Sequence, residues 1–250
     1  MKILSIDTSS AHGSVAFLSD AQVLAEESGE LAGTSSAGLF HRVSSVLGKA
    51  SAKLSEIECF AVATGPGSFT GLRVGLAAVK GWAEVWQRPV VPVSVLEAVA
   101  AMAREPGALR APITDARRGL LFCGAYRRTA PDPSALGAGA SEEAPGGQLG
   151  ELQKFGAEIV ATPAEILDQL LSGDGEAPLF VTPAPQAAVA IVACLAGRSV
   201  RIEMVPSALA PVIGQLGYRR ALRGEVVDAL GLNANYIQRS AAEVNWKEHA

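Results

Sequence analysis

Polar side chains with a potential for chemistry first appear where an apolar segment ends near the N-terminus. Asp7-Thr8-Ser9-Ser10 follows residues 2–6, whose composition is typical of a buried strand. A carboxylate at the carboxyl end of a strand, followed by hydroxyl groups, can line a site for phosphate or for metal-bound phosphate. The same tetrapeptide can form a plain turn in which Asp7 accepts hydrogen bonds from nearby backbone amides. Two interpretations stay open, a phosphate site that includes Asp7 and Thr8 and a turn without a ligand.

A second informative segment is GPGSFTG at residues 65–71, which follows another apolar run. Its glycines permit positive φ angles, Pro66 fixes the turn between them, and Ser68 or Thr70 can cap a following helix. Exposed amides at the start of a helix attract anions. The run lacks the Lys-Ser/Thr pair of a Walker A loop, and its glycines lack the spacing of a dinucleotide-binding loop. It predicts either an anion-binding helix start that includes Gly67 or a tight turn without a ligand.

Two arginines extend these possibilities. Arg73 lies one turn into the helix that follows the glycine run, and it is either an anion contact or a solvated charge. Arg117 belongs to DARRG at residues 115–119, the most polar stretch of the second half of the chain. That stretch is either an ordinary hairpin turn with solvated arginines or a contact for an anion or a protein partner.

The scarce residue types limit metal and redox chemistry. The three histidines and three cysteines never approach HxxxH, HExxH or CxxC spacing; they are His12, His41, His249, Cys59, Cys123 and Cys194. The cysteines are expected to be buried free thiols. Neither a metal site nor a catalytic residue is predicted.

The composition favours a folded protein that does not bind nucleic acid unaided. Among 250 residues, 21 Lys and Arg stand against 25 Asp and Glu, which gives a net charge of −4. Hydrophobic residues make up 49% of the chain and charged residues 18%, which excludes a disordered polymer. No apolar run has the length of a signal peptide or the roughly 20 residues of a membrane span, so a cytoplasmic protein without membrane contact is expected. The apolar surplus indicates a face that another protein covers.

The elements that position the polar residues follow an α/β pattern in the first half. Strands at residues 14–18 and 22–27 are expected to form a hairpin after the first strand. Apolar residues at three- and four-residue intervals predict helices over residues 38–54 and 69–86. One face of the second helix consists of small residues and is expected to receive the first helix closely: Gly71, Gly75 and Ala78.

Two capping boxes mark further helix starts, Ser94 with Glu97 and Thr162 with Glu165. In each, the hydroxyl is expected to accept a hydrogen bond from the amide three residues on, while the Glu carboxylate reaches back. Helices are therefore predicted directly after Ser94 and Thr162.

The pattern restarts near residue 104, which predicts two similar α/β lobes over residues 1–104 and 105–250. Residues 130–150 are rich in Ala, Pro and Gly without periodicity, and a mobile surface loop is expected there. A last helix, over residues 207–224, is expected to pack back on the first lobe.

Several segments occur in an order that resembles one protein family. They are KILSIDTS at 2–9, GPGSFTGLRVG at 65–75, PVSVL at 92–96, DARRG at 115–119 and Tyr236-Ile237. Together they resemble the TsaB (YeaZ) family, strongly over residues 1–126 and weakly over residues 127–205. The resemblance implies two RNase H-like lobes of the actin, sugar-kinase and heat-shock-ATPase superfamily.

The same resemblance implies a role in tRNA modification. Proteins of this family partner a catalytic paralogue, TsaD, and an ATPase, TsaE, in a complex that transfers a threonylcarbamoyl group to an adenosine beside the tRNA anticodon. The paralogue holds its metal with an HxxxH motif that this sequence lacks, which implies a non-catalytic scaffold or activator that reaches tRNA through the complex. Family members also form homodimers when the partner is absent. The alternative is an autonomous ATP-dependent, kinase-like enzyme or a peptidase of the same superfamily.

The residues expected to carry this role form three groups. A helical interface with TsaD is expected at Leu39, Phe40, Val43, Leu72, Leu76 and Val79. A remnant nucleotide cleft is expected at Asp7, Thr8, Gly67, Ser68, Thr70 and Arg73, with no cofactor of the chain's own but with ATP or ADP and Mg²⁺ at the interface of the complex. Arg117 is a further anion or partner contact. The chain departs from the family pattern at Ser35, where His is common, and at Leu120, where Glu is common.

Overall fold

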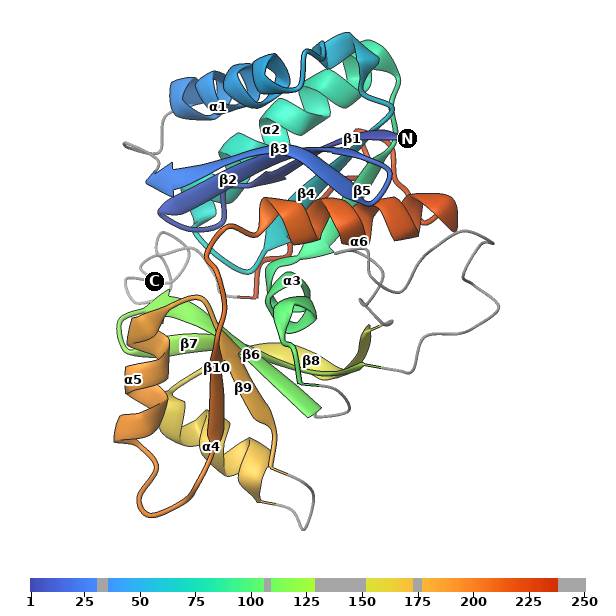
Figure 1. Cartoon of the computed structure of the whole chain (residues 1–250). Coiled ribbons are helices and arrows are strands. Elements are labelled where there is room, and N and C mark those ends of the chain that lie inside the picture. Colours follow the sequence, from blue (N-terminus) through green and yellow to red (C-terminus); the bar gives the residue numbers. More distant parts are fainter. Residues whose placement is uncertain (31–35, 106–108, 129–151, 173–176, 238–250) are drawn as a thin grey trace, which may run out of the picture.

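Two five-stranded sheets, one from each half of the chain, form the described framework of the computed structural model (Figure 1). The structure describes residues 1–30, 36–105, 109–128, 152–172 and 177–237. The loop expected at residues 130–150 and the departure at Ser35 lie outside the described residues.

The first sheet has the strand order β3-β2-β1-β4-β5. An antiparallel meander comes first, made of β1 (Lys2–Asp7), β2 (His12–Ser19) and β3 (Gln22–Glu30). The strands β4 (Cys59–Gly65) and β5 (Val90–Ser94) then continue the sheet parallel to β1. Because β1 and β4 are parallel neighbours, the loops that leave their carboxyl ends meet at one edge of the sheet.

Helices cover both faces of this sheet. The helices α1 (Ser36–Lys49) and α2 (Phe69–Trp86) lie on one face, and α6 (Ala210–Leu222) lies on the other (Figure 1). Successive residues of β1 point to opposite faces, so Leu4 packs under α1 and α2 whereas Ile3 packs under α6. The first lobe therefore has three layers with an apolar core on each side of its sheet.

The second sheet repeats this plan with the order β10-β9-β6-β7-β8. A meander of β6 (Leu109–Arg117), β7 (Leu120–Arg128) and β8 (Leu152–Ala161) is followed by β9 (Leu179–Thr182) and β10 (Arg201–Met204), which run parallel to β6. Counted along the chain, the strands of the two sheets occupy the same places in the same orientations. The two-lobe α/β fold predicted from the sequence is confirmed.

The second sheet also has helices on both faces. The helix α3 (Val95–Met102) lies between the two sheets (Figure 1), where its apolar side chains contact strands of both lobes. The helices α4 (Pro163–Leu171) and α5 (Pro185–Ala193) pack on the opposite face of the second sheet. No helix among the described residues is long and apolar enough to cross a membrane.

One of the two predicted capping boxes forms completely and the other forms by half. Thr162 and Glu165 cap each other at the start of α4, as predicted. Ser94 Oγ accepts a hydrogen bond from the Glu97 amide (3.4 Å), but the Glu97 carboxylate does not reach back. It binds Arg220 of α6 at 2.7 and 2.8 Å instead, because α6 places a guanidinium beside it.

Some element boundaries differ from those predicted. The helix predicted over residues 38–54 ends at Lys49, because Ser51 adopts a positive φ of 51° and a short 3₁₀ turn follows at Leu54–Glu56. The last helix begins at Ala210 rather than residue 207, with a proline in its first turn. The strand β8 was not predicted, because its apolar residues do not alternate regularly with polar ones.

Candidate functional site

The two chemically informative segments pack directly on each other. The Ser68 amide donates a hydrogen bond to the Ser9 carbonyl (2.7 Å). A Cβ atom added at Gly67 would lie 2.4 Å from the Ser9 carbonyl oxygen, and one added at Gly71 would lie 2.1 Å from the Thr8 carbonyl oxygen. Only glycine permits backbone segments to approach this closely.

Thr8 also accounts for the small-residue face of α2. A Cβ atom at Gly75 would lie 2.3 Å from Thr8 Oγ1, so the loop after β1 fills the face that was expected to receive α1. The expected close packing of α1 on Gly71 and Gly75 is therefore wrong. The contact between α1 and α2 uses large side chains instead, with the Phe40 ring edge-on to Trp82 at a centroid distance of 5.7 Å.

The start of α2 is occupied by groups of the chain itself. Ser68 caps the helix, with its Oγ accepting a hydrogen bond from the Gly71 amide (3.3 Å). Four residues expected at a nucleotide cleft do come together: Asp7, Thr8, Gly67 and Ser68. Because not even a Cβ atom fits between Thr8-Ser9 and α2, a phosphate group does not fit between these two segments.

Asp7 is a buried turn residue. Its side chain is almost fully buried, and Oδ1 accepts a hydrogen bond from the Ser9 amide (2.8 Å). The other oxygen, Oδ2, and Thr8 Oγ1 are buried without a hydrogen-bond partner among the described residues. Burial raises the pKa of Asp7, and the hydrogen bonds with Ser9 offset only part of that effect. Relative to water, the site therefore shifts the equilibrium of Asp7 toward the neutral carboxylic acid.

The C-terminal segment, defined here as residues 232–237, lies over the glycine turn. The Asn235 amide donates to the Thr64 carbonyl (2.8 Å), and the Asn235 carbonyl oxygen lies 2.7 Å from where a Cβ of Gly65 would be. The Tyr236 ring packs on Phe69 with a centroid distance of 5.0 Å. The turn is thus covered on its outer side as well.

Arg73 fixes the same segment. Its Nε donates to the Tyr236 hydroxyl (3.3 Å), and its guanidinium carbon lies 3.7 Å from the centroid of the Phe69 ring. The distance to the ring is that of a cation–π contact. Within the described chain, Arg73 is thus an anchor for the C-terminal segment rather than a freely solvated charge.

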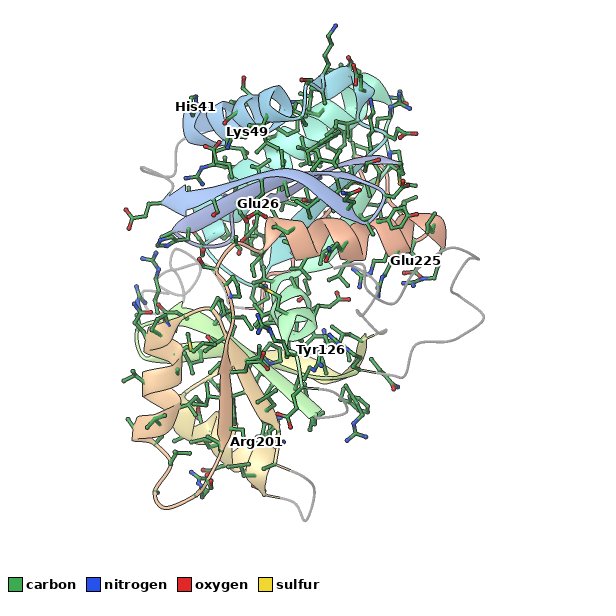
Figure 2. The ribbon with its side chains drawn as sticks, viewed as in Figure 1. Glu26, His41, Lys49, Tyr126, Arg201 and Glu225 are labelled. Carbon is green, nitrogen blue, oxygen red and sulfur yellow. The ribbon has the colours of Figure 1, made fainter. Side chains whose placement is uncertain are left out.

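A polar cluster that the sequence did not predict lies at the junction of the lobes. The buried Glu158 carboxylate accepts hydrogen bonds from Ser94 Oγ (2.5 Å), the Tyr126 hydroxyl (2.5 Å) and Asn235 Nδ2 (2.7 Å), and Lys154 Nζ lies 3.7 Å away. Tyr126 lies on the side of the second sheet that faces α3 (Figure 2). Burial and the neighbouring Glu158 raise the pKa of Tyr126. The only sequence signal for this cluster was an unassigned glutamate between apolar residues after the 130–150 segment.

The DARRG stretch forms the hairpin turn between β6 and β7. Asp115 Oδ1 accepts a hydrogen bond from the Arg117 amide (2.7 Å), and Arg117, Arg118 and Gly119 all have positive φ angles. Both arginines are exposed. The hairpin interpretation of the stretch is observed, and a partner contact through Arg117 stays a prediction.

Most of the predicted interface residues do not lie on the surface. Five of the six are buried in the core of the first lobe: Leu39, Val43, Leu72, Leu76 and Val79. Their apolar face is covered by the sheet of their own lobe, which leaves it unavailable to a second protein. The prediction that these five form a partner interface is wrong. Phe40, which is 49% exposed, is the member of the set that reaches the surface.

A groove of about 520 Å³ lies beside Phe40, between α1 and α2. Its lining is mostly apolar and includes two of the residues predicted for the nucleotide cleft: Phe40, Phe69, Thr70, Arg73, Val74, Ala77 and Ala78. Thr70 and Arg73 thus face this groove, in which Arg73 supplies the charge. The seam between the two helices is therefore one apolar surface of the first lobe among the described residues.

Comparison with known proteins identifies relatives of this chain. A family model described as TsaD, tRNA N6-adenosine threonylcarbamoyltransferase, matches residues 33–139. The tRNA threonylcarbamoyladenosine biosynthesis protein TsaB of Bacillus subtilis (strain 168) is 37% identical over 127 residues, which are 51% of this chain and 56% of the relative. The protein of the same name from Escherichia coli (strain K12) is 35% identical over 131 residues, with the same two shares. About half of the chain is thus similar in sequence to proteins named TsaB.

The fold resembles that of two solved structures over nearly the whole chain. The structure described as YeaZ from Pseudomonas aeruginosa has a TM-score of 0.70 at 24% identity and covers 94% of this chain and 99% of that one. A second structure is described as an uncharacterized protein with similarity to peptidase YeaZ from Pseudomonas aeruginosa. It has a TM-score of 0.71 at 24% identity, and the match covers 95% of this chain and 99% of that one. In sequence, by contrast, the chain spans about half the length of the curated TsaB proteins it matches.

Proposed function

We propose that this chain acts in the biosynthesis of threonylcarbamoyladenosine in tRNA, as a subunit that does not itself carry out the transfer. The curated relatives are named for this biosynthesis, and the family model over residues 33–139 is named for the transferase. The proposed partner is a catalytic subunit of the TsaD type, with a TsaE-type ATPase and tRNA as further members of the complex. The proposed location is the cytoplasm.

The observation that carries the proposal is the apolar groove between α1 and α2. Phe40 is half exposed at its edge, and the rest of the lining includes Phe69, Val74 and Ala77. Exposed apolar side chains that line a concave surface are typical of an interface with another protein, where aromatic residues contribute strongly to binding. The proposed role of the groove is to bind an apolar helix of the TsaD-type subunit. In the absence of that subunit, a second copy of this chain would occupy the same groove as a homodimer.

The packing beside Asp7 supports a non-catalytic role. The segment after β1 is packed through Thr8 and Ser9 against the glycines at the start of α2, so these residues are engaged by the chain itself. ATP or ADP with Mg²⁺ is therefore proposed only at the interface with the other subunits. There this chain would offer Thr70 and Arg73, which line the groove.

The function is tested by complementation in a bacterium depleted of its own TsaB. Expression of this chain is expected to restore threonylcarbamoyladenosine in tRNA, measured by mass spectrometry of digested nucleosides. Failure of a well-expressed wild-type chain to restore the nucleoside overturns the proposed function.

The groove is tested by Phe40→Asp and Ala77→Asp, which place a charge on its exposed wall. An unpaired charge buried in an interface costs about 3–5 kcal/mol, so affinity for the TsaD-type subunit should fall at least about 100-fold. Co-elution in size-exclusion chromatography should be lost for both variants. Val189→Asp is the matched control, because Val189 is a 68% exposed apolar residue on α5 of the other lobe. Co-elution of all three variants would show that the partner binds elsewhere.

A further inference from the structure

The groove between α1 and α2 ends at a stack of side chains that the C-terminal segment completes. Phe69 and Arg73 line the groove, and the Tyr236 ring packs on Phe69 with a centroid distance of 5.0 Å. The Tyr236 hydroxyl accepts a hydrogen bond from Arg73 Nε (3.3 Å). Tyr236 is itself 45% exposed, so the apolar surface of the groove continues onto its ring.

The two neighbours of Tyr236 face the other lobe. Asn235 Nδ2 donates to Glu158 Oε2 on β8 (2.7 Å), and Ile237 packs on an apolar cluster of the second lobe that includes Phe122. The C-terminal segment thus contacts α2 with one residue and the second lobe with the residues on either side of it. Every described residue that lines the groove lies on α1 or α2. Tyr236 therefore links the groove to the second lobe.

The position of Asn235 is fixed by several contacts. Its partner Glu158 is buried, and the Glu158 carboxylate also accepts hydrogen bonds from the hydroxyl groups of Ser94 and Tyr126. The Asn235 amide donates in addition to the Thr64 carbonyl (2.8 Å). Asn235 is therefore held by its side chain to one lobe and by its backbone to the other, which places the adjacent tyrosine.

An exposed aromatic side chain that is already held in place suits a binding surface. Tyrosine is among the residues that contribute most to protein interfaces, because its ring supplies a large contact area. Binding normally costs conformational entropy of the side chains that become ordered. The contacts of Tyr236 with Phe69 and Arg73 reduce this cost, because they order the ring before a partner binds.

We propose that Tyr236 contacts the protein that binds in the groove, and that Glu158 acts through Asn235 as its positioning residue. Both assignments rest on the proposed function, since the protein in question is the catalytic subunit of the TsaD type. An apolar helix of that subunit lying along the groove would reach Tyr236 at the Phe69 end. The second lobe would then influence the affinity for the partner without contributing to the groove lining.

The contact is tested by titrating the purified TsaD-type subunit into the whole chain in isothermal titration calorimetry. Tyr236→Ala should weaken binding about tenfold or more, because the ring is lost from the interface. Tyr236→Phe should bind within about threefold of the wild type, since it keeps the ring and loses only one exposed hydrogen bond. The matched control is Phe155→Ala, which removes a 41% exposed ring from β8 and should bind like the wild type. Wild-type affinity, or a higher affinity, in Tyr236→Ala overturns the proposal.

The positioning role is tested by a double-mutant cycle. Asn235→Ala keeps the backbone hydrogen bond of the segment but releases Tyr236 from Glu158, and it should weaken binding about three- to tenfold. In a Tyr236→Ala background the same change should have no further effect, because the residue to be positioned is absent. Asn233→Ala is the matched control, since the Asn233 side chain bonds to a nearby backbone carbonyl at an exposed position. Wild-type affinity of Asn235→Ala, or additive effects of the two substitutions, contradicts the positioning role.

The outcomes for Tyr236 and for the groove can be distinguished. Phe40→Asp tests whether the partner occupies the groove at all. Weakened binding of Phe40→Asp together with wild-type affinity of Tyr236→Ala would keep the groove as the partner site and overturn only the role of Tyr236. Absence of binding by the wild-type chain would overturn the proposed partner and the role of Tyr236 together. Each variant is checked for the wild-type circular dichroism spectrum before titration, so that lost affinity does not reflect lost folding.

Discussion

Two glycines on the same helix are expected to respond in opposite ways to one added methyl group. At Gly71 the new Cβ would lie 2.1 Å from the backbone oxygen of Thr8, so the loop after β1 would have to move. Gly71→Ala should therefore lower the free energy of unfolding by about 1–3 kcal/mol in urea titrations. Gly81→Ala is the control, since nothing lies within 4 Å of its Cβ, and it should raise that free energy by about 0.5–1 kcal/mol. Equal stability of the two variants would show that the loop is not seated on α2.

Asp7 should make the protein less stable as the pH rises. Its pKa is raised by burial in the folded state, whereas the carboxyl of the unfolded chain titrates near pH 4. The folded state therefore binds this proton more tightly, and its contribution to stability is full below about pH 4 and lost as the pH rises through the folded pKa. Asp7→Asn keeps an oxygen for the Ser9 amide without the charge. Its stability relative to the wild type in urea should thus increase from pH 4 to pH 8, and a decrease would mean that Asp7 is ionised and paired.

Among the elements, the C-terminal segment depends on one side chain that reaches the other lobe. Asn235 donates to the buried Glu158 carboxylate, whereas Asn233 donates only to the nearby Gly231 carbonyl at an exposed position. Asn235→Ala should cost about 1.5–3 kcal/mol, the usual effect of losing a hydrogen bond to a charged group, and should speed proteolysis of the chain end. Asn233→Ala should change the unfolding free energy by less than about 0.5 kcal/mol. Similar cleavage rates in both variants would show that Glu158 does not hold the segment.

The elements also show what local sequence can and cannot predict. The bounds of α2 were predicted correctly, because a serine cap and an apolar stripe are local signals. Periodicity identified the apolar faces of α1 and α2 but not what covers them, so residues such as Leu76 were assigned to a partner when the sheet of their own lobe buries them. The spacing of Gly71 and Gly75 indicated that another segment packs closely on α2, but it did not show that this segment is the loop with Thr8.

The cluster around Glu158 could not be predicted from the sequence, because it depends on contacts between residues far apart in the chain. Glu158 and Asn235 are 77 residues apart, and neither lies in a pattern that specifies a partner. The strand β8, which carries Glu158, is an edge strand whose apolar residues do not alternate regularly with polar ones, so it gives no clear strand signal. The cluster at the lobe junction therefore exists only once both sheets and the C-terminal segment are in place.

At the scale of the whole molecule, Glu158 is expected to make the two lobes unfold together. Its carboxylate receives donors from Ser94 at the end of the first sheet, from Tyr126 of the second sheet and from Asn235. Glu158→Ala would leave the buried Tyr126 hydroxyl, and the partly buried donors of Ser94 and Asn235, without this acceptor. A buried unsatisfied group costs about 1–3 kcal/mol, so the free energy of unfolding should fall by at least about 1 kcal/mol. The unfolding transitions of the two lobes should then no longer coincide.

Unfolding of the first lobe can be followed separately, because the two tryptophans of the described residues, Trp82 and Trp86, both lie on α2. In a Trp246→Phe background, fluorescence reports the first lobe, whereas far-ultraviolet circular dichroism reports both. The two urea transitions should coincide in that background and in the exposed control Glu84→Ala, and should separate in Glu158→Ala. Coincident transitions in all three would assign the coupling to α3, whose apolar side chains pack against both sheets. Separated transitions would connect the groove between α1 and α2 to the lobe junction, because Tyr236 packs on Phe69 of the groove while the adjacent Asn235 binds Glu158.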